Sequence, residues 1–573
     1  MNSTSPSILN ARPTRWTRAS IVLIVVLTIA LGLRVWGIWF GLPYIFHNDE
    51  GLEVLRALQL GSGEFDFERI GKGGYFYILF VEYGFFFVLL KIFGIVSSAD
   101  DFALIFVRDP SAFFLIGRAT TAVVGAITVF LVYRIGRFAY STHAAVLAAG
   151  FLTVNVLHAK LSHFITVDVP MTCLATGALY FAIKISNDGR SRDYRCAALM
   201  AALAITTKIP AVLLIVPLLT AHWLYTKEYC GGIRQFLFSG LLWQSAAIFL
   251  GAYLLLTPGI IVNFGDFVSS MLGVFQSFGQ GAADGAGAVS LGASETNRFA
   301  YYFSELAEGA TIPVFLICIS GMAYGLWKRE KADIILIPFT LIVFAVMSIA
   351  SDPHHFYPRY LLPIIPVMAL VAGRFLDDMF AFIAEDRRTA ASTVLFVAIC
   401  VVPTISIANN NHRMSQPDTR AVAKQWFDAN ISGGSKVFIE GSRTRPTKGT
   451  IPLQNSAENI RASIDHFQVI EPGKAKFFEL ELRTLSGNTY DLVTVASTDL
   501  QDLQYYKNLG VQYLVLRSNA YAGSRRQTHW QEFVTNVRSD PHIELIKNFT
   551  PIADSTPGPF IEIYRVNDNS RGD

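Results

Sequence analysis

Long apolar runs recur along most of the chain and are separated by short polar segments. A helix of about 20 apolar residues is long enough to cross a bilayer. Runs that reach or approach this length are Ile21–Leu42, Ala112–Tyr133, Ala144–His158, Ile165–Ile185, Cys196–Thr207, Ile209–Tyr225, Phe236–Thr257, Ile312–Trp327, Ile334–Ala350, Tyr360–Phe382 and Ser392–Ala408. The pattern predicts a polytopic α-helical membrane protein with about 11 transmembrane helices.

The basic residues between these runs agree with this topology. With residues 1–19 in the cytoplasm, every Lys/Arg cluster between spans falls on the inner side, as the positive-inside rule requires. Cys196–Thr207 and Ile209–Tyr225 are short and meet at Lys208-Ile209-Pro210. We interpret them as a tight hairpin of two helices, the alternative being one long kinked helix.

Gly74–Phe93 is a further apolar segment long enough to span the membrane. A span here would place all the later basic loops outside. The segment is strongly aromatic and contains Glu82 and Lys91. We therefore favour an interfacial or re-entrant segment within the first outer loop, residues 43–111.

Composition supports the membrane class. The chain of 573 residues is 52% hydrophobic and only 16% charged, whereas soluble proteins carry about 25% charged residues. A net charge of +3 gives no indication of a nucleic-acid partner. The five cysteines show no CxxC spacing, so they indicate neither a disulfide framework nor a zinc site.

The chain changes character after the transmembrane domain, which we assign to residues 20–408. Residues 409–573 are polar and mixed in charge. Predicted helices alternate here with predicted strands: helices at Ala421–Asn430 and Leu500–Asn508, strands at Lys436–Glu440, Tyr490–Val495, Val511–Leu516 and Ile561–Val566. We expect a soluble α/β domain on the outer side, because an odd number of spans precedes it.

Charged residues gather on the predicted outer face, and each has a simple structural interpretation. Asp49 could be a solvated loop residue, Asp168 a helix cap before Pro170, Lys208 a side chain reaching the interface, and Arg359 a surface anchor. Together they fit a site better. Two separated carboxylates and two cations can bind a phosphate and remove a proton, with one carboxylate as general base and the other holding a metal or orienting the nucleophile.

Four motifs resemble a known family. They are Asp49-Glu50 followed by Ala57–Gly63; Gly117-Arg118 at the start of a span; Asp168 before Pro170, with Thr207-Lys208 further on; and Tyr357–Pro366, similar to an "RYLLPLLP" element. Over about residues 15–410 the chain resembles the C-type glycosyltransferases (GT-C) of the protein O-mannosyltransferase and lipid A aminoarabinose transferase-like family, in particular its bacterial members. Residues 409–573 resemble a periplasmic domain of some of these members.

The resemblance implies an enzyme, a glycosyltransferase that uses a polyprenyl-phosphate sugar in one inverting displacement. It implies Asp49 as general base, Glu50 in support, and Asp168 at the second acidic position. Lys208 and Arg359 would bind the donor phosphate. Further candidates for substrate binding are Tyr360, His163, His354, His355, Tyr357 and Lys72. Metal dependence varies among such enzymes, so a divalent cation (Mg, Mn or Zn) on Asp49 and Asp168 stays open.

The chain also departs from the family. Many relatives have Ser-Arg where this chain has Ser162-His163, and a His-Pro-Pro-like element where it has Gly71-Lys72-Gly73-Gly74. A neutral histidine would weaken phosphate binding. In the long outer loop, residues 258–310, the stretch Gly279–Ser294 is rich in Gly and Ala and is either a lid or a connector.

Two other classes of function stay open at this point. One is a transporter or flippase for a lipid-linked sugar. The surface position of the acidic residues and the lack of an internal repeat argue against it. The other is a non-catalytic envelope assembly protein. The expected location is the bacterial inner membrane with the site on the periplasmic side. The acceptor could be a protein, lipid A, another glycolipid or a polysaccharide.

Overall fold

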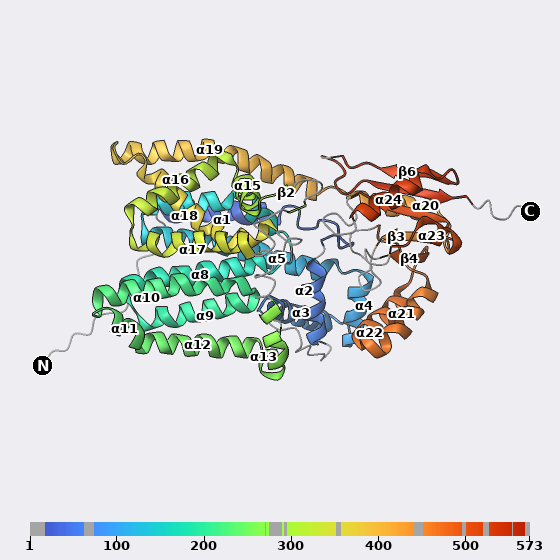
Figure 1. Cartoon of the computed structure of the whole chain (residues 1–573), viewed down its shortest axis with the longest axis horizontal. Coiled ribbons are helices and arrows are strands. Elements are labelled where there is room, and N and C mark those ends of the chain that lie inside the picture. The colour runs from blue at the N-terminus through green and yellow to red at the C-terminus, as the bar shows by residue number, and fades with distance from the viewer. Residues whose placement is uncertain are drawn as a thin grey trace, which may run out of the picture.

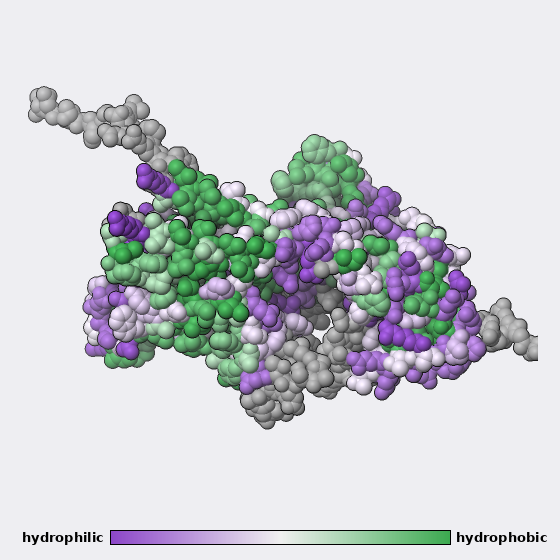
Figure 2. Space-filling model, turned by 90° about the horizontal axis from the view of Figure 1, so that it is seen from above, coloured by the Kyte–Doolittle hydropathy of each residue, from purple (hydrophilic) through white to green (hydrophobic). Residues whose placement is uncertain are grey.

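The chain forms a bundle of long helices joined to a smaller α/β part (Figure 1). The computed structural model describes residues 18–47, 49–61, 74–269, 271–273, 289–290, 295–350, 357–440, 451–495, 500–518, 527–552 and 554–567. Hydrophobic side chains gather over the helical part, and hydrophilic ones gather at the junction and over the C-terminal part (Figure 2). The predicted fold class, a polytopic helical protein with a C-terminal α/β domain, is confirmed.

The helical part is built from the following elements: α1 (Arg18–Val35), α2 (Glu50–Gly61), α3 (Gly74–Ile92), α4 (Ala99–Arg108), α5 (Ser111–Ala139), α6 (Thr142–Thr153), α7 (Val156–Leu161), α8 (Asp168–Asp188), α9 (Ser191–Thr207), η1 (Ile209–Leu214), α10 (Ile215–Tyr229), α11 (Ile233–Phe238), α12 (Gly240–Leu256), α13 (Gly259–Val262), α15 (Arg298–Ala310), α16 (Ile312–Lys328), α17 (Lys331–Ala350), η2 (Pro358–Ile364), α18 (Ile365–Asp378) and α19 (Glu385–Met414). The short strands β1 (Val289–Ser290) and β2 (Glu295–Thr296) pair between α13 and α15.

Within the described residues, nine helices are long and apolar enough to cross a membrane, or ten if the bent pair α15–α16 counts as one span. The prediction of about 11 differs in three places. Two predicted spans are shorter helices, α6 with 12 residues and α9 with 17. The segment that we expected to lie at the interface is one 19-residue helix, α3.

One side of α3 rests on the start of α5. Tyr75 donates a hydrogen bond to the Gly117 carbonyl (3.0 Å), and Tyr83 donates one to the Phe113 carbonyl (3.1 Å). Val81 and Phe85 are exposed. The helix thus has an apolar face free to contact lipid, and its interfacial position stays a prediction.

The predicted hairpin of α9 and α10 is confirmed. Gly189, which caps α8 just before α9 begins, lies against the Tyr225 ring near the end of α10, because an added Cβ would come within 2.0 Å of that ring. Nearby, the Tyr194 hydroxyl lies 2.5 Å from Nδ1 of His222. The turn between the two helices therefore carries Lys208 to the opposite end of the bundle.

The C-terminal part is a five-stranded sheet with helices, in the order β4-β3-β5-β7-β6. Its elements are α20 (Thr419–Asn430), β3 (Lys436–Glu440), α21 (Ala457–Ile470), α22 (Pro472–Thr484), β4 (Asp491–Val495), α23 (Leu503–Asn508), β5 (Tyr513–Arg517), α24 (Gln527–Ser539), β6 (Ile543–Phe549) and β7 (Ile561–Val566). All four predicted strands are present. The sequence did not predict β6, an edge strand with no buried residue, because the apolar alternation of Ile543-Glu544-Leu545 breaks at Ile546, where the pairing with β7 shifts register.

The C-terminal part is held against the first outer loop. The guanidinium of Arg420 lies 3.8 Å from the centroid of the Phe46 ring. Lys476 on α22 forms an ion pair with Asp100 on α4 at 3.3 Å. These contacts place the α/β domain over the end of the bundle that carries Asp49 (Figure 1).

Candidate functional site

Four charged residues from distant parts of the chain meet at this end of the bundle. Nη1 of Arg359 donates to Oδ2 of Asp49 at 2.6 Å, and its Nε lies 3.9 Å from Oδ2 of Asp168. Nζ of Lys208 lies 2.6 Å from Oδ1 of Asp168. The structure therefore joins the two carboxylates and two cations into one alternating cluster.

Local sequence explains how the two cations are presented. Lys208 follows the end of α9 in an extended conformation, and Arg359 is the second residue of η2. Lys208 leads into the 3-10 helix η1, which has Pro210 in its first turn. Arg359 lies in the first turn of the 3-10 helix η2, which begins with Pro358. Proline fits there because it needs no hydrogen-bond partner for a backbone N–H. Both cations therefore lie where a helix begins, with their side chains free to turn toward Asp168.

Two tyrosines flank the cluster. The Arg359 guanidinium lies 4.2 Å from the centroid of the Tyr357 ring, and Nζ of Lys208 lies 4.7 Å from that of Tyr360. Cations are attracted to aromatic faces at such distances. Tyr357 and Tyr360 thus hold the cations in place and leave other donor atoms for a ligand.

The two carboxylates differ in exposure. The side chain of Asp49 is 44% exposed, whereas that of Asp168 is 4% exposed. A buried carboxylate needs compensating charge, which Lys208 supplies. Asp49 is the carboxylate that a substrate can reach, and Asp168 is placed to hold the cations.

Glu50 has a different environment from its neighbour Asp49. It is fully buried and accepts two hydrogen bonds of 2.7 Å from the Arg118 guanidinium and one of 3.1 Å from Ile165 N–H. Arg118 also donates to the carbonyls of Ile38 and Phe40 at 2.8 Å. Glu50 therefore fits a positioning role and not contact with substrate. Sequence reasoning named Gly117-Arg118 as a motif but did not find this pairing.

His163, expected near the donor phosphate, lies apart from the cation cluster. It is fully buried, and its ring nitrogens lie 2.9 Å from the Ala159 carbonyl and 3.0 Å from that of Trp36. Burial lowers its pKa. Its ring links the end of α7 to the segment after α1, so it is not placed to bind a phosphate.

His47 is a residue that sequence reasoning passed over. Its ring stacks on Phe164 at 4.2 Å between centroids, and Asp49 N–H lies 3.4 Å from its Nδ1. Burial lowers the pKa of His47. Its place two residues before Asp49 in the sequence was the available signal. It fixes the backbone that presents Asp49.

Several predicted residues lie outside the described residues: Lys72, His354, His355 and most of Gly279–Ser294. Among the residues that the structure does describe, no group of three or more His, Cys, Asp or Glu side chains is arranged to hold a metal ion. Oδ2 of Asp49 and Oδ2 of Asp168 both face the Arg359 guanidinium. The charge that a divalent ion would supply between them is thus supplied by arginine.

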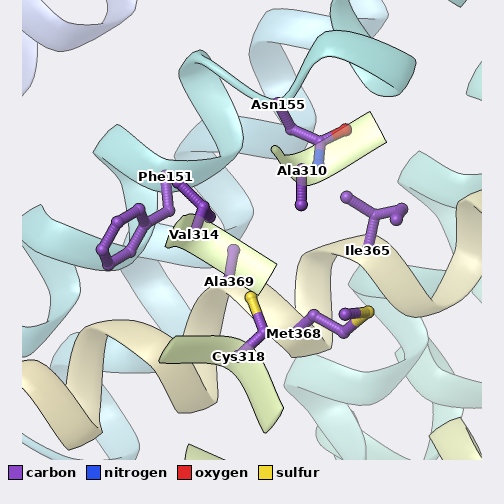
Figure 3. Close-up of a pocket in the computed structure, with 8 residues that line it drawn as sticks. All are labelled: Phe151, Asn155, Ala310, Val314, Cys318, Ile365, Met368 and Ala369. Carbon is purple, nitrogen blue, oxygen red and sulfur yellow. The ribbon is translucent and has the colours of Figure 1, made fainter. Parts of the chain in front are cut away.

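A small apolar hollow within the bundle contains none of the charged residues of the cluster (Figure 3). It is lined by Phe151, Asn155, Ala310, Val314, Cys318, Ile365, Met368 and Ala369. Asn155 is the polar side chain among these, and its Oδ1 already accepts a hydrogen bond from His158 N–H at 2.9 Å. The hollow therefore belongs to the packing between α6, α16 and α18.

Comparison with known proteins gives two family matches. The dolichyl-phosphate-mannose-protein mannosyltransferase family matches residues 114–257, and the Alg9-like mannosyltransferase family matches residues 296–429. These matches and the shared fold indicate a membrane glycosyltransferase. The predicted class of enzyme is thereby confirmed. No curated protein matches the whole chain closely enough to be counted as a relative.

The transferase also shares its fold with a solved structure. ArnT from Cupriavidus metallidurans in the apo state aligns with a TM-score of 0.50 at 13% identity, over 96% of this chain and 98% of that chain. ArnT bound to undecaprenyl phosphate aligns with a TM-score of 0.49. The archaeal oligosaccharyltransferase AglB from Archaeoglobus fulgidus, in complex with an inhibitory peptide and a dolichol-phosphate, gives 0.47 at 13% identity, over 87% of this chain and 69% of that chain.

Proposed function

We propose that this transferase moves a sugar from a polyprenyl-phosphate donor to an acceptor hydroxyl, at the outer face of a bacterial inner membrane and with inversion. The observation that carries the proposal is the cluster itself, in which an accessible carboxylate, Asp49, pairs with Arg359, and Asp168 links Arg359 to a second cation, Lys208. A dolichyl-phosphate sugar family matches part of the same bundle. The acceptor class, whether protein, lipid or glycan, stays open.

In the proposed reaction Asp49 is the general base. The acceptor oxygen forms a bond to the anomeric carbon, and its proton passes to Asp49. The bond from the anomeric carbon to the phosphate oxygen breaks, and the electron pair leaves with the lipid phosphate. Lys208 and Arg359 stabilise the charge on the departing phosphate, because charge-assisted hydrogen bonds are about twice as strong as neutral ones.

The ion pair between Arg359 and Asp49 fits this sequence of events. A donor phosphate that binds Arg359 would take over the N–H group that Asp49 holds at 2.6 Å. Asp49 would then be free to accept the acceptor proton. Asp168 keeps its bond to Lys208 throughout, so the cation does not follow the leaving group.

The proposal routes no step through a divalent ion. Asp49 and Asp168 were the expected metal ligands, and both are compensated by cationic side chains within the described residues. Two carboxylates and two cations balance in charge before the donor phosphate binds, so the proposal needs no further cation to hold the cluster together.

Sugar transfer from a panel of polyprenyl-phosphate sugars by the purified protein tests the proposal. Asp49→Asn keeps the shape of the side chain and removes the base, and donor binding should persist. Asp188→Asn, a change at an exposed residue on the far end of the bundle, is the matched control. We expect transfer to be lost in Asp49→Asn alone. Equal transfer by both variants would remove Asp49 from the mechanism, and donor movement across liposomes without transfer would favour a flippase.

A further inference from the structure

The C-terminal sheet has the topology of a ligand-binding sheet. Its first three strands in sequence, β3, β4 and β5, are parallel, with β3 between the other two. The chain therefore moves from β3 to β4 on one side and then crosses to β5 on the other. In open α/β sheets, ligands bind outside the carboxyl ends of the strands where the strand order reverses in this way. Here that point lies between the ends of β3 and β5.

An unusual ion pair occupies this point. Glu440 is the last residue of β3, Arg517 is the last residue of β5, and their side chains form an ion pair. The carboxylate is 5% exposed and the guanidinium side chain 24% exposed. Among the residues that the structure describes, Oε2 of Glu440 and Nε of Arg517 have no hydrogen-bond partner. Buried polar atoms are normally satisfied, so this pair has a spare acceptor beside a spare donor.

The carboxyl edge of the sheet faces the membrane part of the protein. After β5, Ser518 exchanges hydrogen bonds with Phe560, of 2.8 Å and 3.0 Å. The residues before Phe560 bind Thr419 at the start of α20. Thr419 donates its N–H to the Pro557 carbonyl and its hydroxyl to the Pro559 carbonyl, each at 2.8 Å. Arg420, next along α20, lies over Phe46 in the first outer loop. The ends of β3 and β5 thus lie on the side of the domain toward Asp49.

We propose that Glu440 and Arg517 form a sugar-binding subsite. A hydroxyl group can donate to Oε2 of Glu440 and accept from Nε of Arg517 at the same time. With Glu440 ionised, an anion would meet the carboxylate and a cation would meet the guanidinium, so the ionised pair selects a neutral hydroxylated ligand. Sugar binding at this subsite is independent of the proposed function. The assignment of that sugar to the acceptor or to the lipid-linked donor rests on the proposed function.

The environment of Glu440 suits this ligand. Burial raises its pKa to about 7, against the opposing effect of Arg517. A carboxyl group that is readily protonated can donate to a hydroxyl as well as accept from it. Either form of Glu440 can therefore bind one hydroxyl of a sugar ring.

Saturation-transfer NMR on the full-length protein in detergent, with a panel of neutral monosaccharides and with methyl phosphate as the anionic probe, tests the proposal. Glu440→Gln replaces part of the acceptor with a donor, and Arg517→Lys keeps the charge but removes Nε. Glu562→Gln, in an ion pair with Arg538 elsewhere on the same sheet, is the matched control. We expect a sugar signal in wild type and Glu562→Gln, at least a several-fold loss of it in the two subsite variants, and a methyl phosphate signal that neither subsite variant changes.

Transfer kinetics identify the source of the sugar. A raised KM for acceptor at unchanged kcat assigns the subsite to the acceptor, and a raised KM for donor assigns it to the donor. Asp49→Asn should keep the sugar signal, so failure of the catalytic proposal leaves this result intact. No sugar signal from wild type, or equal signals from wild type and both subsite variants with unchanged thermal stability, would overturn the proposal.

Discussion

Replacing Glu50 with glutamine should destabilise the protein much more than replacing an exposed glutamate. Glu50 and Arg118 are both fully buried and share two hydrogen bonds of 2.7 Å. The glutamine NH2 would face an Arg118 N–H group, leaving two donors in contact and a buried cation without its counter-ion. Removing one partner of a buried ion pair costs about 3–5 kcal/mol. The loop that presents Asp49 should loosen as a result, and sugar transfer should fall with stability.

Thermal and denaturant unfolding in detergent, followed by tryptophan fluorescence, measures this effect. Glu228→Gln, which affects the exposed ion pair with Lys331, is the matched control and should unfold like the wild type. A double variant, Glu50→Leu with Arg118→Met, should recover part of the lost stability, because it leaves no unpaired charge but still removes the side-chain partners of the Ile38 and Phe40 carbonyls and of Ile165 N–H. Wild-type stability of Glu50→Gln would refute the assignment of Glu50 as the anchor of the loop.

Three further predictions follow from other contacts. Arg359→Lys should lower transfer by roughly 10- to 100-fold, since losing one charge-assisted hydrogen bond costs about 1.5–3 kcal/mol. Arg190→Lys is the control in the same assay, and an equal effect of the two substitutions would contradict the role of Arg359. Burial raises the pKa of Glu440 and of Glu481 to about 7, so the free energy of unfolding should be highest below the unfolded-state pKa and fall as pH rises through about 7, by at most about 3 kcal/mol for each group. Unfolding at about pH 5 and about pH 8 checks this pH dependence, and equal stability of the wild type at both would count against it. Gly373→Ala should cost about 1–3 kcal/mol, because the new methyl group would lie 2.5 Å from the backbone nitrogen of Ala148; Gly84→Ala, which meets nothing within 4 Å, should unfold like the wild type.

The apolar pattern predicted the bundle well because burial in lipid requires long runs of apolar residues. The prediction of membrane-spanning helices from this pattern was weakest at α6 and α9, where short helices are covered by neighbouring helices and not by lipid. The alternating strands and helices of the C-terminal domain were also readable. The edge strand β6 was not, since its side chains are largely exposed.

The candidate site could be predicted in its members but not in its pairings. Motif order placed Asp49, Asp168, Lys208 and Arg359 on one face, and the structure joins them. Adjacent carboxylates, however, read alike in a sequence. Only the fold shows that Asp49 is accessible while Glu50 is buried against Arg118, because that partner lies 68 residues away. The same holds for Glu440 and Arg517, which meet only through the strand order.

The link between α19 and α20 has a consequence for how large molecules gain access. Only residues 415–418 join the two helices. Both sides of the link are fastened, by Asn411 donating to the Leu33 carbonyl at 2.6 Å and by Arg420 over Phe46. Independent domain movement needs a longer, flexible linker. Under the proposed function, we therefore expect the fixed α/β domain to limit the size of acceptor that reaches Asp49, and this limit on acceptor binding should persist in Asp49→Asn.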